Sequence, residues 1–193
     1  MNFILASKSP RRKELLNKIG LEFEVIPAHI NENLNEKNPE LFACNLAYEK
    51  AFAVWQKNQD STVIGSDTIV VCNNQILGKP CNPEEAVSYM KVLSGKEHTV
   101  ISGIGLCSKK VKDKCICKTK VFFKNLDKDE IDKYIKSNEW TDKAGGYGIQ
   151  GHASLFIEKI EGCYFNVVGF PVNSFYEICT KNSIDLKRYL KWD

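Results

Sequence analysis

The chain has no apolar run that approaches the length of a membrane span, which argues against a transmembrane protein. Its first basic residues follow a very short apolar segment rather than precede a long one, so no signal peptide is expected. Basic residues outnumber acidic ones only by 27 to 24, too even a balance for the broad cationic face that binds nucleic acid non-specifically. We therefore expect a cytoplasmic protein without a membrane or nucleic-acid partner.

Several catalytic and metal-binding motifs are also missing. The sequence has no CxxC pair, no HExxH, no GK[ST] and no GxSxG, and its three histidines are scattered. These absences argue against a zinc site, a Walker loop and a serine nucleophile. The eight cysteines occur in a chain with ample core-forming residues, so we expect reduced thiols rather than a disulfide scaffold.

The N-terminal segment predicts a strand that leads through a polar turn into a helix. Ser9 is suited to the N-cap, Pro10 to the first helical position, and Gly20 to the end of the helix. Arg11 and Arg12 add positive charge to a helix end whose N–H groups already favour anions. The segment is thus typical of a phosphate site, although two solvated surface arginines are the competing interpretation.

The remaining pattern alternates helices with strands, and 193 residues fit one domain or two packed lobes. We expect helices that begin after Asn38, Asn82 and Asp127 and near Asn173, and strands over residues 62–72, 98–107, 114–124 and 154–160. In the helix after Asn38, the residues expected to face inward are Leu41, Phe42, Leu46, Ala47 and Phe52, with Lys50 near one edge. The fold class is α/β, with one mixed, twisted sheet flanked by helices.

Asp67 is the strongest candidate for chemistry. It lies between small residues in an otherwise apolar strand, where a carboxylate is costly to bury unless it binds a metal, pairs with a cation or lines a cleft. The alternative is a structural aspartate, either salt-bridged or at the edge of a sheet. Lys79, in the turn Gly78-Lys79-Pro80, points either to phosphate binding or to an ordinary surface lysine. By themselves, Glu32 and Lys50 are interpreted as solvated residues.

A loop with four glycines follows at residues 143–151. Its backbone permits close approach to a ligand, and the amide of Gln150 offers both a donor and an acceptor for the edge of a base. Tyr147 can pack beside it. The alternative is a tight connection between a helix and a strand.

Taken together, these segments resemble the Maf family of nucleoside triphosphate pyrophosphatases, also called septum formation inhibitor proteins. The similarity spans nearly the whole chain, as a single domain over residues 1–193. Its landmarks are residues 5–16, Gly65-Ser66-Asp67-Thr68, Gly78-Lys79-Pro80, Leu93-Ser94-Gly95 with His98, residues 142–151, and Ile160-Glu161-Gly162 with residues 165–171. The resemblance implies a fold of the Maf and inosine-triphosphatase type, with a cleft between two lobes.

The resemblance also implies the reaction and the residues that perform it. Such enzymes use Mg²⁺ or Mn²⁺ to split the bond between the α and β phosphates, which yields a nucleoside monophosphate and pyrophosphate. Asp67 resembles the proton acceptor and metal ligand, Glu32 a second acidic participant that shares the metal, and Lys79 a further member of the catalytic set. The positions that hold the triphosphate are matched by Ser7, Arg12, Lys50 and Lys79.

Three more positions bear on which nucleotide is used. Members selective for dTTP and UTP have arginine, threonine and glutamine where this chain has Arg11, Thr68 and Gln150. The chain therefore resembles the pyrimidine branch rather than the branch that acts on 7-methyl-GTP. A nucleotide-sensing regulator of cell division with little turnover is the alternative function, and a homodimer, frequent in the family, is left open.

Overall fold

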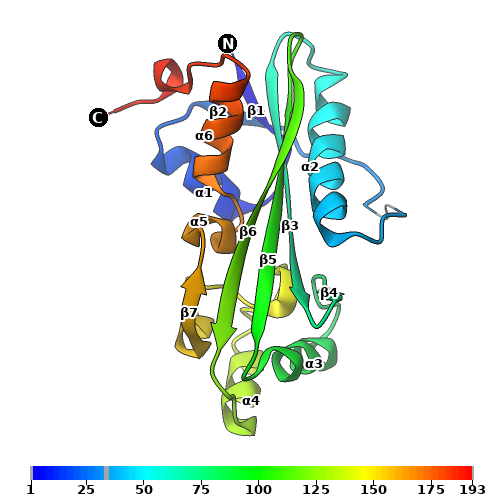
Figure 1. The fold of residues 1–193 in the computed structure, drawn as a ribbon, viewed down its shortest axis with the longest axis vertical. Helices are drawn as coiled ribbons and strands as arrows, with labels where there is room; N and C mark the ends of the chain where they lie inside the picture. Colours follow the sequence, from blue (N-terminus) through cyan, green and yellow to red (C-terminus); the bar gives the residue numbers. More distant parts are fainter. Residues whose placement is uncertain (1, 33–34, 193) are drawn as a thin grey trace. The chain divides into compact units, whose positions relative to one another are not determined.

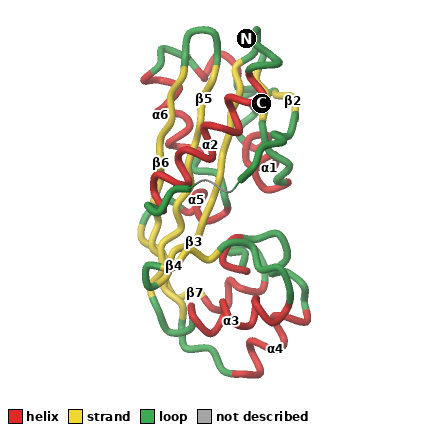
Figure 2. Tube along the Cα trace, turned by 90° about the vertical axis from the view of Figure 1, so that its right-hand side faces the viewer, coloured by secondary structure: helices red, strands yellow, loops and turns green. Residues whose placement is uncertain are grey.

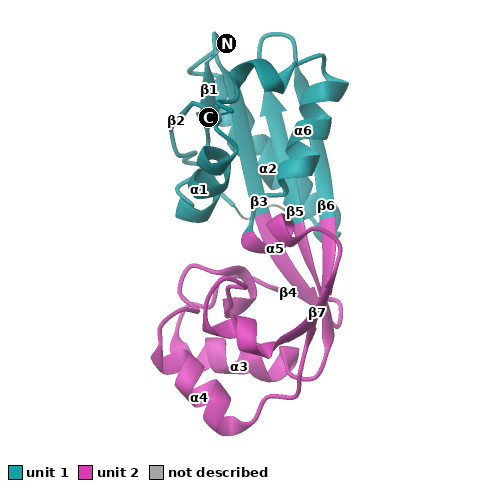
Figure 3. Cartoon of the chain, turned by 90° about the vertical axis from the view of Figure 1, so that its left-hand side faces the viewer, with its two compact units in different colours: residues 1–67, 102–117, 169–193 teal, residues 68–101, 118–168 magenta. Residues whose placement is uncertain are grey.

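The computed structural model describes residues 2–32 and 35–192. The chain divides into two compact units, coloured separately in Figure 3. Unit 1 comprises residues 1–67, 102–117 and 169–193, and unit 2 comprises residues 68–101 and 118–168. Three strands, β3 (Thr62–Cys72), β5 (Glu97–Cys107) and β6 (Lys112–Phe123), contribute residues to both units. Because Asp67 is the last residue of unit 1 in β3 and Thr68 the first of unit 2, the predicted site residues are divided between the units.

The strands form one seven-stranded mixed sheet in the order β2-β1-β3-β5-β6-β7, with β4 paired to β3 (Figure 1). β1 (Phe3–Leu5) is parallel to both β2 (Phe23–Val25) and β3. β4 (Gln75–Leu77) is antiparallel to β3, and β7 (Ile157–Glu161) is antiparallel to β6. Because helices flank this sheet, the predicted fold class, α/β with a mixed sheet, is confirmed.

In unit 1, the helix α2 (Pro39–Trp55) lies unusually close to β3 and β5. A Cβ atom on Gly65 would lie 2.1 Å from the carbonyl oxygen of Ala47, and one on Gly103 would lie 2.2 Å from that of Ala43. Such distances exclude any side chain at these strand positions. Glycine on the sheet and alanine on the helix therefore bring α2 near the centre of β3. The other long helices of unit 1 are α1 (Pro10–Lys18) and α6 (Val172–Lys181).

Unit 2 has its own apolar core, in which residues of β3, β5 and β6 are packed with its helices. α3 (Pro83–Leu93) packs against α4 (Lys128–Lys136), as Figure 2 shows. Fully buried members include Leu77, Met90, Val121 and Tyr134. The short helix α5 (Tyr164–Val168) and the 3₁₀ turns Ala144–Gly146 and His152–Phe156 complete the unit, and Leu186–Tyr189 forms another 3₁₀ turn in unit 1.

Most of the predicted elements are confirmed. β3 has the predicted bounds, and α4 begins after Asp127 as predicted, with a capping box formed by Asp127 and Glu130. All eight cysteines are free thiols, as predicted. Within residues 2–32 and 35–192, no helix combines the length and the apolar character that crossing a membrane requires.

Three local predictions are wrong. Leu41 does not face inward but is 50% exposed, whereas Lys50, placed near an edge, is buried. The strand expected over residues 154–160 begins only at Ile157, because His152–Phe156 forms a 3₁₀ turn. Ser9 does occupy the N-cap of α1 as predicted, although its side chain makes no capping hydrogen bond.

The buried His98 makes stability depend on pH. Its Nε2 lies 2.7 Å from the hydroxyl of Tyr147, and the ring is packed edge-on against Phe123. Burial lowers the pKa of His98 from 6.5 to about 4, because the imidazolium loses its hydration. Between these values the unfolded chain binds the proton that the folded protein excludes, so stability falls as the pH falls through this window.

We expect the free energy of unfolding to decrease by on the order of 3 kcal/mol between pH 7.5 and pH 4 because of His98. Urea unfolding at several pH values measures this dependence. The His98→Gln variant removes the titrating group and should flatten the curve between pH 6.5 and 4. An equally steep curve in that variant would assign the pH dependence to other groups.

Candidate active site

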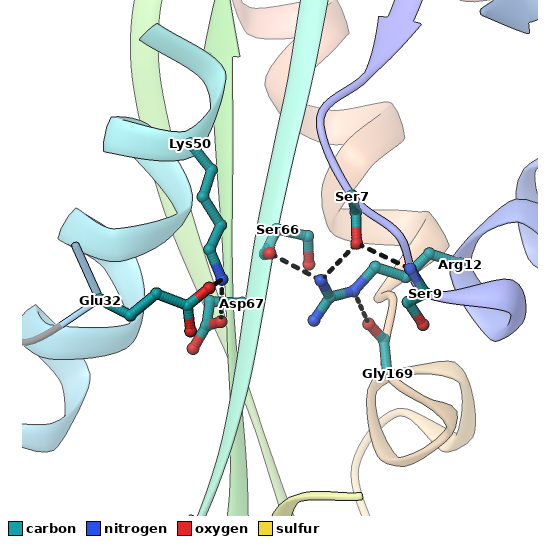
Figure 4. A network of polar contacts seen from close by, with 8 residues as sticks. All are labelled: Ser7, Ser9, Arg12, Glu32, Lys50, Ser66, Asp67 and Gly169. Carbon is teal, nitrogen blue, oxygen red and sulfur yellow. Dashed lines mark hydrogen bonds and ion pairs between the residues drawn. The ribbon is translucent and has the colours of Figure 1, made fainter. Parts of the chain in front are cut away.

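An ion-pair cluster lies where α2 passes β3. The Nζ atom of Lys50 is 2.8 Å from Oδ1 of Asp67 and 2.8 Å from Oε1 of Glu32 (Figure 4). The side chains of Lys50 and Asp67 are only 10% and 13% exposed, whereas that of Glu32 is 59% exposed. The ammonium group of Lys50 thus lies between two carboxylates, that of the buried Asp67 and that of the exposed Glu32.

The sequence explains locally why these groups meet. Successive residues of a strand face opposite sides of its sheet, so Gly65 and Asp67 share one face of β3. The missing side chain of Gly65 admits the backbone of α2 at Ala47 and Ala51. Lys50 lies between these alanines along the helix and reaches Asp67 from there. Close packing at Gly65 therefore determines the position of the charged pair.

Arg12, in the first turn of α1, is bonded to three separate segments of unit 1. Its Nε donates to the carbonyl oxygen of Gly169 at 3.0 Å. Its Nη1 donates to Oγ of Ser7 at 2.9 Å and to the carbonyl oxygen of Ser66 at 2.8 Å (Figure 4). The interpretation of this arginine as a solvated surface residue is therefore wrong. Arg12 fixes the loop after β1 against the middle of β3.

Electrostatics link Arg12 to the acidic pair. Burial lowers the pKa of the Arg12 guanidinium, because it removes water from the charged group. The negative charges of Asp67 and Glu32 raise the pKa of Arg12, whereas the positive charge of Arg11 lowers it further. Two arginines and two carboxylates thus influence one another within unit 1, and Arg12 stays protonated near neutral pH.

The loop before α1 is organised by Ser7. Its Oγ accepts a hydrogen bond from the backbone N–H of Ser9 at 3.3 Å, in addition to the one from Arg12. Ser7 is buried, with 8% exposure. The loop therefore holds a defined conformation at the N-terminus of a nine-residue helix, the end that attracts anions.

The acidic pair suits a divalent cation. Two carboxylates converge on one positively charged atom, and carboxylate oxygen is the donor that Mg²⁺ and Mn²⁺ prefer. Within the part of the chain that the structure describes, no group of three or more His, Cys, Asp or Glu side chains forms a metal cage.

The other predicted residues belong to unit 2. Lys79 is exposed in the turn after β4, Gln150 is exposed in the glycine loop, and Thr68 is partly buried. The backbone N–H of Gly145 donates to the carbonyl oxygen of Gly78 at 2.9 Å, which joins the glycine loop to the turn of Lys79. Unit 1 thus contains Ser7, Arg11, Arg12, Glu32, Lys50 and Asp67, and unit 2 contains Thr68, Lys79 and Gln150.

Two groups at the site were not predicted from the sequence. The carbonyl oxygens of Ser66 and Gly169 both accept hydrogen bonds from Arg12. Gly169 has a φ of +120°, a conformation that favours glycine. A backbone carbonyl leaves no signal in the identity of its residue, so the sequence itself offered no more than the glycine at position 169.

Comparisons with known proteins cover almost the whole chain. A family described as "Maf-like protein" matches residues 2–182. A dTTP/UTP pyrophosphatase of Thermosipho africanus is 49% identical over 181 residues, 92% of either chain. One of Geobacillus is 50% identical over 171 residues, which cover 88% of this chain and 92% of the relative. The structure of the Staphylococcus aureus Ham1 protein matches 64% of this chain and 71% of the Ham1 chain, at 13% identity. The TM-score of 0.44 is too low to establish a shared fold.

Proposed function

We propose that this chain, which belongs to the Maf family, hydrolyses nucleoside triphosphates, foremost dTTP and UTP, to the nucleoside monophosphate and pyrophosphate. The observation that carries the proposal is the convergence of Lys50, Glu32 and Asp67. It occurs in a chain about half identical to relatives named dTTP/UTP pyrophosphatase. The reaction removes unwanted nucleotides before a polymerase uses them.

In the proposed reaction, Asp67 accepts a proton from the attacking water through a carboxylate oxygen. Lys50 keeps this carboxylate in place, since its ammonium group is bonded to Oδ1. Attack at the α phosphorus breaks the bond to the β phosphate, and pyrophosphate leaves without a covalent intermediate. This agrees with a sequence that has no serine-nucleophile motif.

The cationic residues stabilise the negative charge of the triphosphate. Arg12 and Ser7 hold it at the N-terminus of α1, and Lys50 and Lys79 add positive charge. Asp67 and Glu32 would also hold Mg²⁺ or Mn²⁺. When bound, this metal neutralises phosphate charge and makes pyrophosphate a better leaving group.

Specificity for pyrimidines is proposed to involve three side chains. Arg11, Thr68 and Gln150 occupy the positions that distinguish the dTTP and UTP branch. The amide of Gln150 matches the acceptor O4 and the donor N3–H of uracil or thymine. Cytosine presents the opposite pattern at this edge, an amino donor and a ring acceptor, so it is expected to bind more weakly.

The proposal extends to the whole chain as one catalytic domain over residues 1–193, acting in the cytoplasm on free nucleotides. Lys and Arg exceed Asp and Glu only by three, which supports a local phosphate site rather than a nucleic-acid surface. A homodimer is compatible with this function, which requires no partner protein.

We expect metal-dependent pyrophosphate release to be fastest with dTTP and UTP, because the Gln150 amide complements their base edge. The measurement compares dTTP, UTP, CTP, GTP, ATP and 7-methyl-GTP with Mg²⁺, with Mn²⁺ and with a chelator. Faster turnover of another nucleotide would contradict the proposed specificity but not the proposed pyrophosphatase activity. Nucleotide binding without any turnover would contradict that activity and favour a nucleotide-sensing regulator.

A further inference from the structure

The glycine loop that carries Gln150 is fixed within unit 2 mainly through its first half. Gly145 donates to the carbonyl oxygen of Gly78 at 2.9 Å, and the carbonyl oxygen of Gly146 accepts from the hydroxyl of Tyr134 at 3.2 Å. Tyr147 is buried and bonded to His98. Gly148 also makes a backbone hydrogen bond to Tyr134, and its carbonyl oxygen accepts the N–H of Gly151 at 3.2 Å. The position of the exposed Gln150, which lies between Gly148 and Gly151, therefore depends also on what holds the end of the loop.

Glu139 supplies that contact. Its Oε2 accepts the backbone N–H of His152 at 2.8 Å, and its Oε1 pairs with Nδ1 of the same histidine. Its own carbonyl oxygen accepts a hydrogen bond from Nζ of Lys143, the first residue of the loop. One residue therefore contacts both the beginning and the end of the segment that carries Gln150.

The carboxylate of Glu139 occupies space that a glycine leaves open. A Cβ atom on Gly151 would lie 2.1 Å from Oε2 and 2.7 Å from Cδ of Glu139. Gly151 follows Gln150 directly and has a φ of −114°, which any residue can adopt. Glycine is therefore needed here for the close approach of the carboxylate rather than for its backbone conformation.

Trp140 anchors Glu139 to the core of unit 2. The indole is 8% exposed, and its Nε1 donates to the carbonyl oxygen of Ile135 at 3.1 Å. The Glu139 side chain itself is 26% exposed. The residue that follows Glu139 in sequence is thus tied to the core of unit 2 by burial and by a hydrogen bond.

We propose that Glu139 is a positioning residue for nucleobase selection, which holds the end of the glycine loop so that Gln150 presents its amide in one orientation. This inference rests on the proposed function, in which Gln150 recognises the pyrimidine edge. An amide discriminates between bases only when its donor and acceptor are oriented before binding. A loop end released from Glu139 must be ordered each time a nucleotide binds, which lowers affinity and selectivity.

The test compares four variants of the full chain. Glu139→Ala removes the carboxylate, and Gly151→Ala displaces it by the added Cβ, so both should give the same result. Glu139→Gln keeps an oxygen that accepts the N–H of His152 and should rescue part of the effect. Asp129→Ala is the matched control, because Asp129 is an exposed carboxylate of the same unit that is paired with Lys133 at 2.6 Å.

We expect KM for dTTP and UTP to rise about tenfold in Glu139→Ala and Gly151→Ala while kcat changes less than about threefold. The preference for dTTP over CTP in kcat/KM should fall about fivefold or more, because CTP gains nothing from an oriented Gln150. Backbone amides of residues 148–152 should exchange hydrogen faster in both variants. Asp129→Ala should match the wild type in all three measurements.

A second readout separates this inference from the reaction itself. Equilibrium binding of dTTP and of CTP in the presence of a chelator reports selectivity without turnover. A wild-type protein that binds dTTP selectively but releases no pyrophosphate overturns the proposed reaction and leaves the role of Glu139 standing. Unchanged selectivity in Glu139→Ala, or an equal loss of affinity for every nucleotide, overturns the role of Glu139 whether or not the enzyme is active.

Discussion

Turnover of dTTP is expected to fall by about a hundredfold to ten-thousandfold in Asp67→Asn, the range that loss of a general base produces. Asparagine has the shape of aspartate and retains a side-chain oxygen. This oxygen can accept the hydrogen bond that Lys50 donates to Asp67 at 2.8 Å in the wild type. It has no negative charge and takes up no proton from water. The substitution therefore removes the proposed chemistry of Asp67 while it leaves the packing between β3 and α2 intact.

Pyrophosphate release at saturating dTTP measures this loss, and thermal unfolding and dTTP binding establish whether the fold and the site survive. Asp60→Asn is a suitable control, because Asp60 is a highly exposed aspartate of unit 1 paired with Lys109 at 2.6 Å. We expect that control to retain full turnover. Turnover within about threefold of the wild type in Asp67→Asn would exclude this carboxylate as the general base.

Arg12→Ala is expected to lower the free energy of unfolding by about 2 to 4 kcal/mol, because it leaves three buried or half-buried acceptors without their donor. These acceptors belong to Ser7, Ser66 and Gly169, which lie on different segments of unit 1. Arg12→Lys should recover only part of the loss. An ammonium group cannot reproduce the planar fork that reaches all three oxygens. Both variants should also raise KM for dTTP, since Arg12 is one of the residues proposed to hold the triphosphate.

Urea unfolding of the wild type and of both variants measures the stability effect. Arg188→Ala provides the comparison, because the Arg188 side chain is 78% exposed and is paired with Asp185, three residues earlier. A change below about 0.5 kcal/mol is expected there, as for other surface ion pairs. Equal stability of Arg12→Lys and the wild type would show that charge, rather than the three-way hydrogen bonding, accounts for the role of Arg12.

Local signals in the sequence were sufficient where the stabilising groups are close in the chain. The capping box of α4 joins Asp127 to Glu130, three residues apart, and both of its hydrogen bonds form. The β-branched run over residues 62–72 forms one strand with the predicted bounds. Asn82 caps α3 as expected, although Glu85 bonds to the N–H of Cys81 and leaves the capping box incomplete.

Predictions about burial were weaker, because burial depends on what packs against a helix. Leu41 has the periodicity of an inward residue, yet it is 50% exposed near the start of α2. Lysine is a residue type usually found at the surface, yet Lys50 is buried beside Asp67. The close approach of α2 to Gly65 and Gly103 decides both outcomes, and a helical pattern contains no information about the strand that it will meet.

The sequence by itself determined the fold class, the family and the identity of the candidate residues, because these follow from local periodicity and from ordered motifs. Only the tertiary structure decided which of those residues meet. Arg12 and Gly169 are 157 positions apart and share a hydrogen bond, and Lys50 reaches Glu32 and Asp67 from a separate helix. Such contacts depend on how strands pair and how closely helices pack, which are properties of the whole folded chain rather than of any short segment.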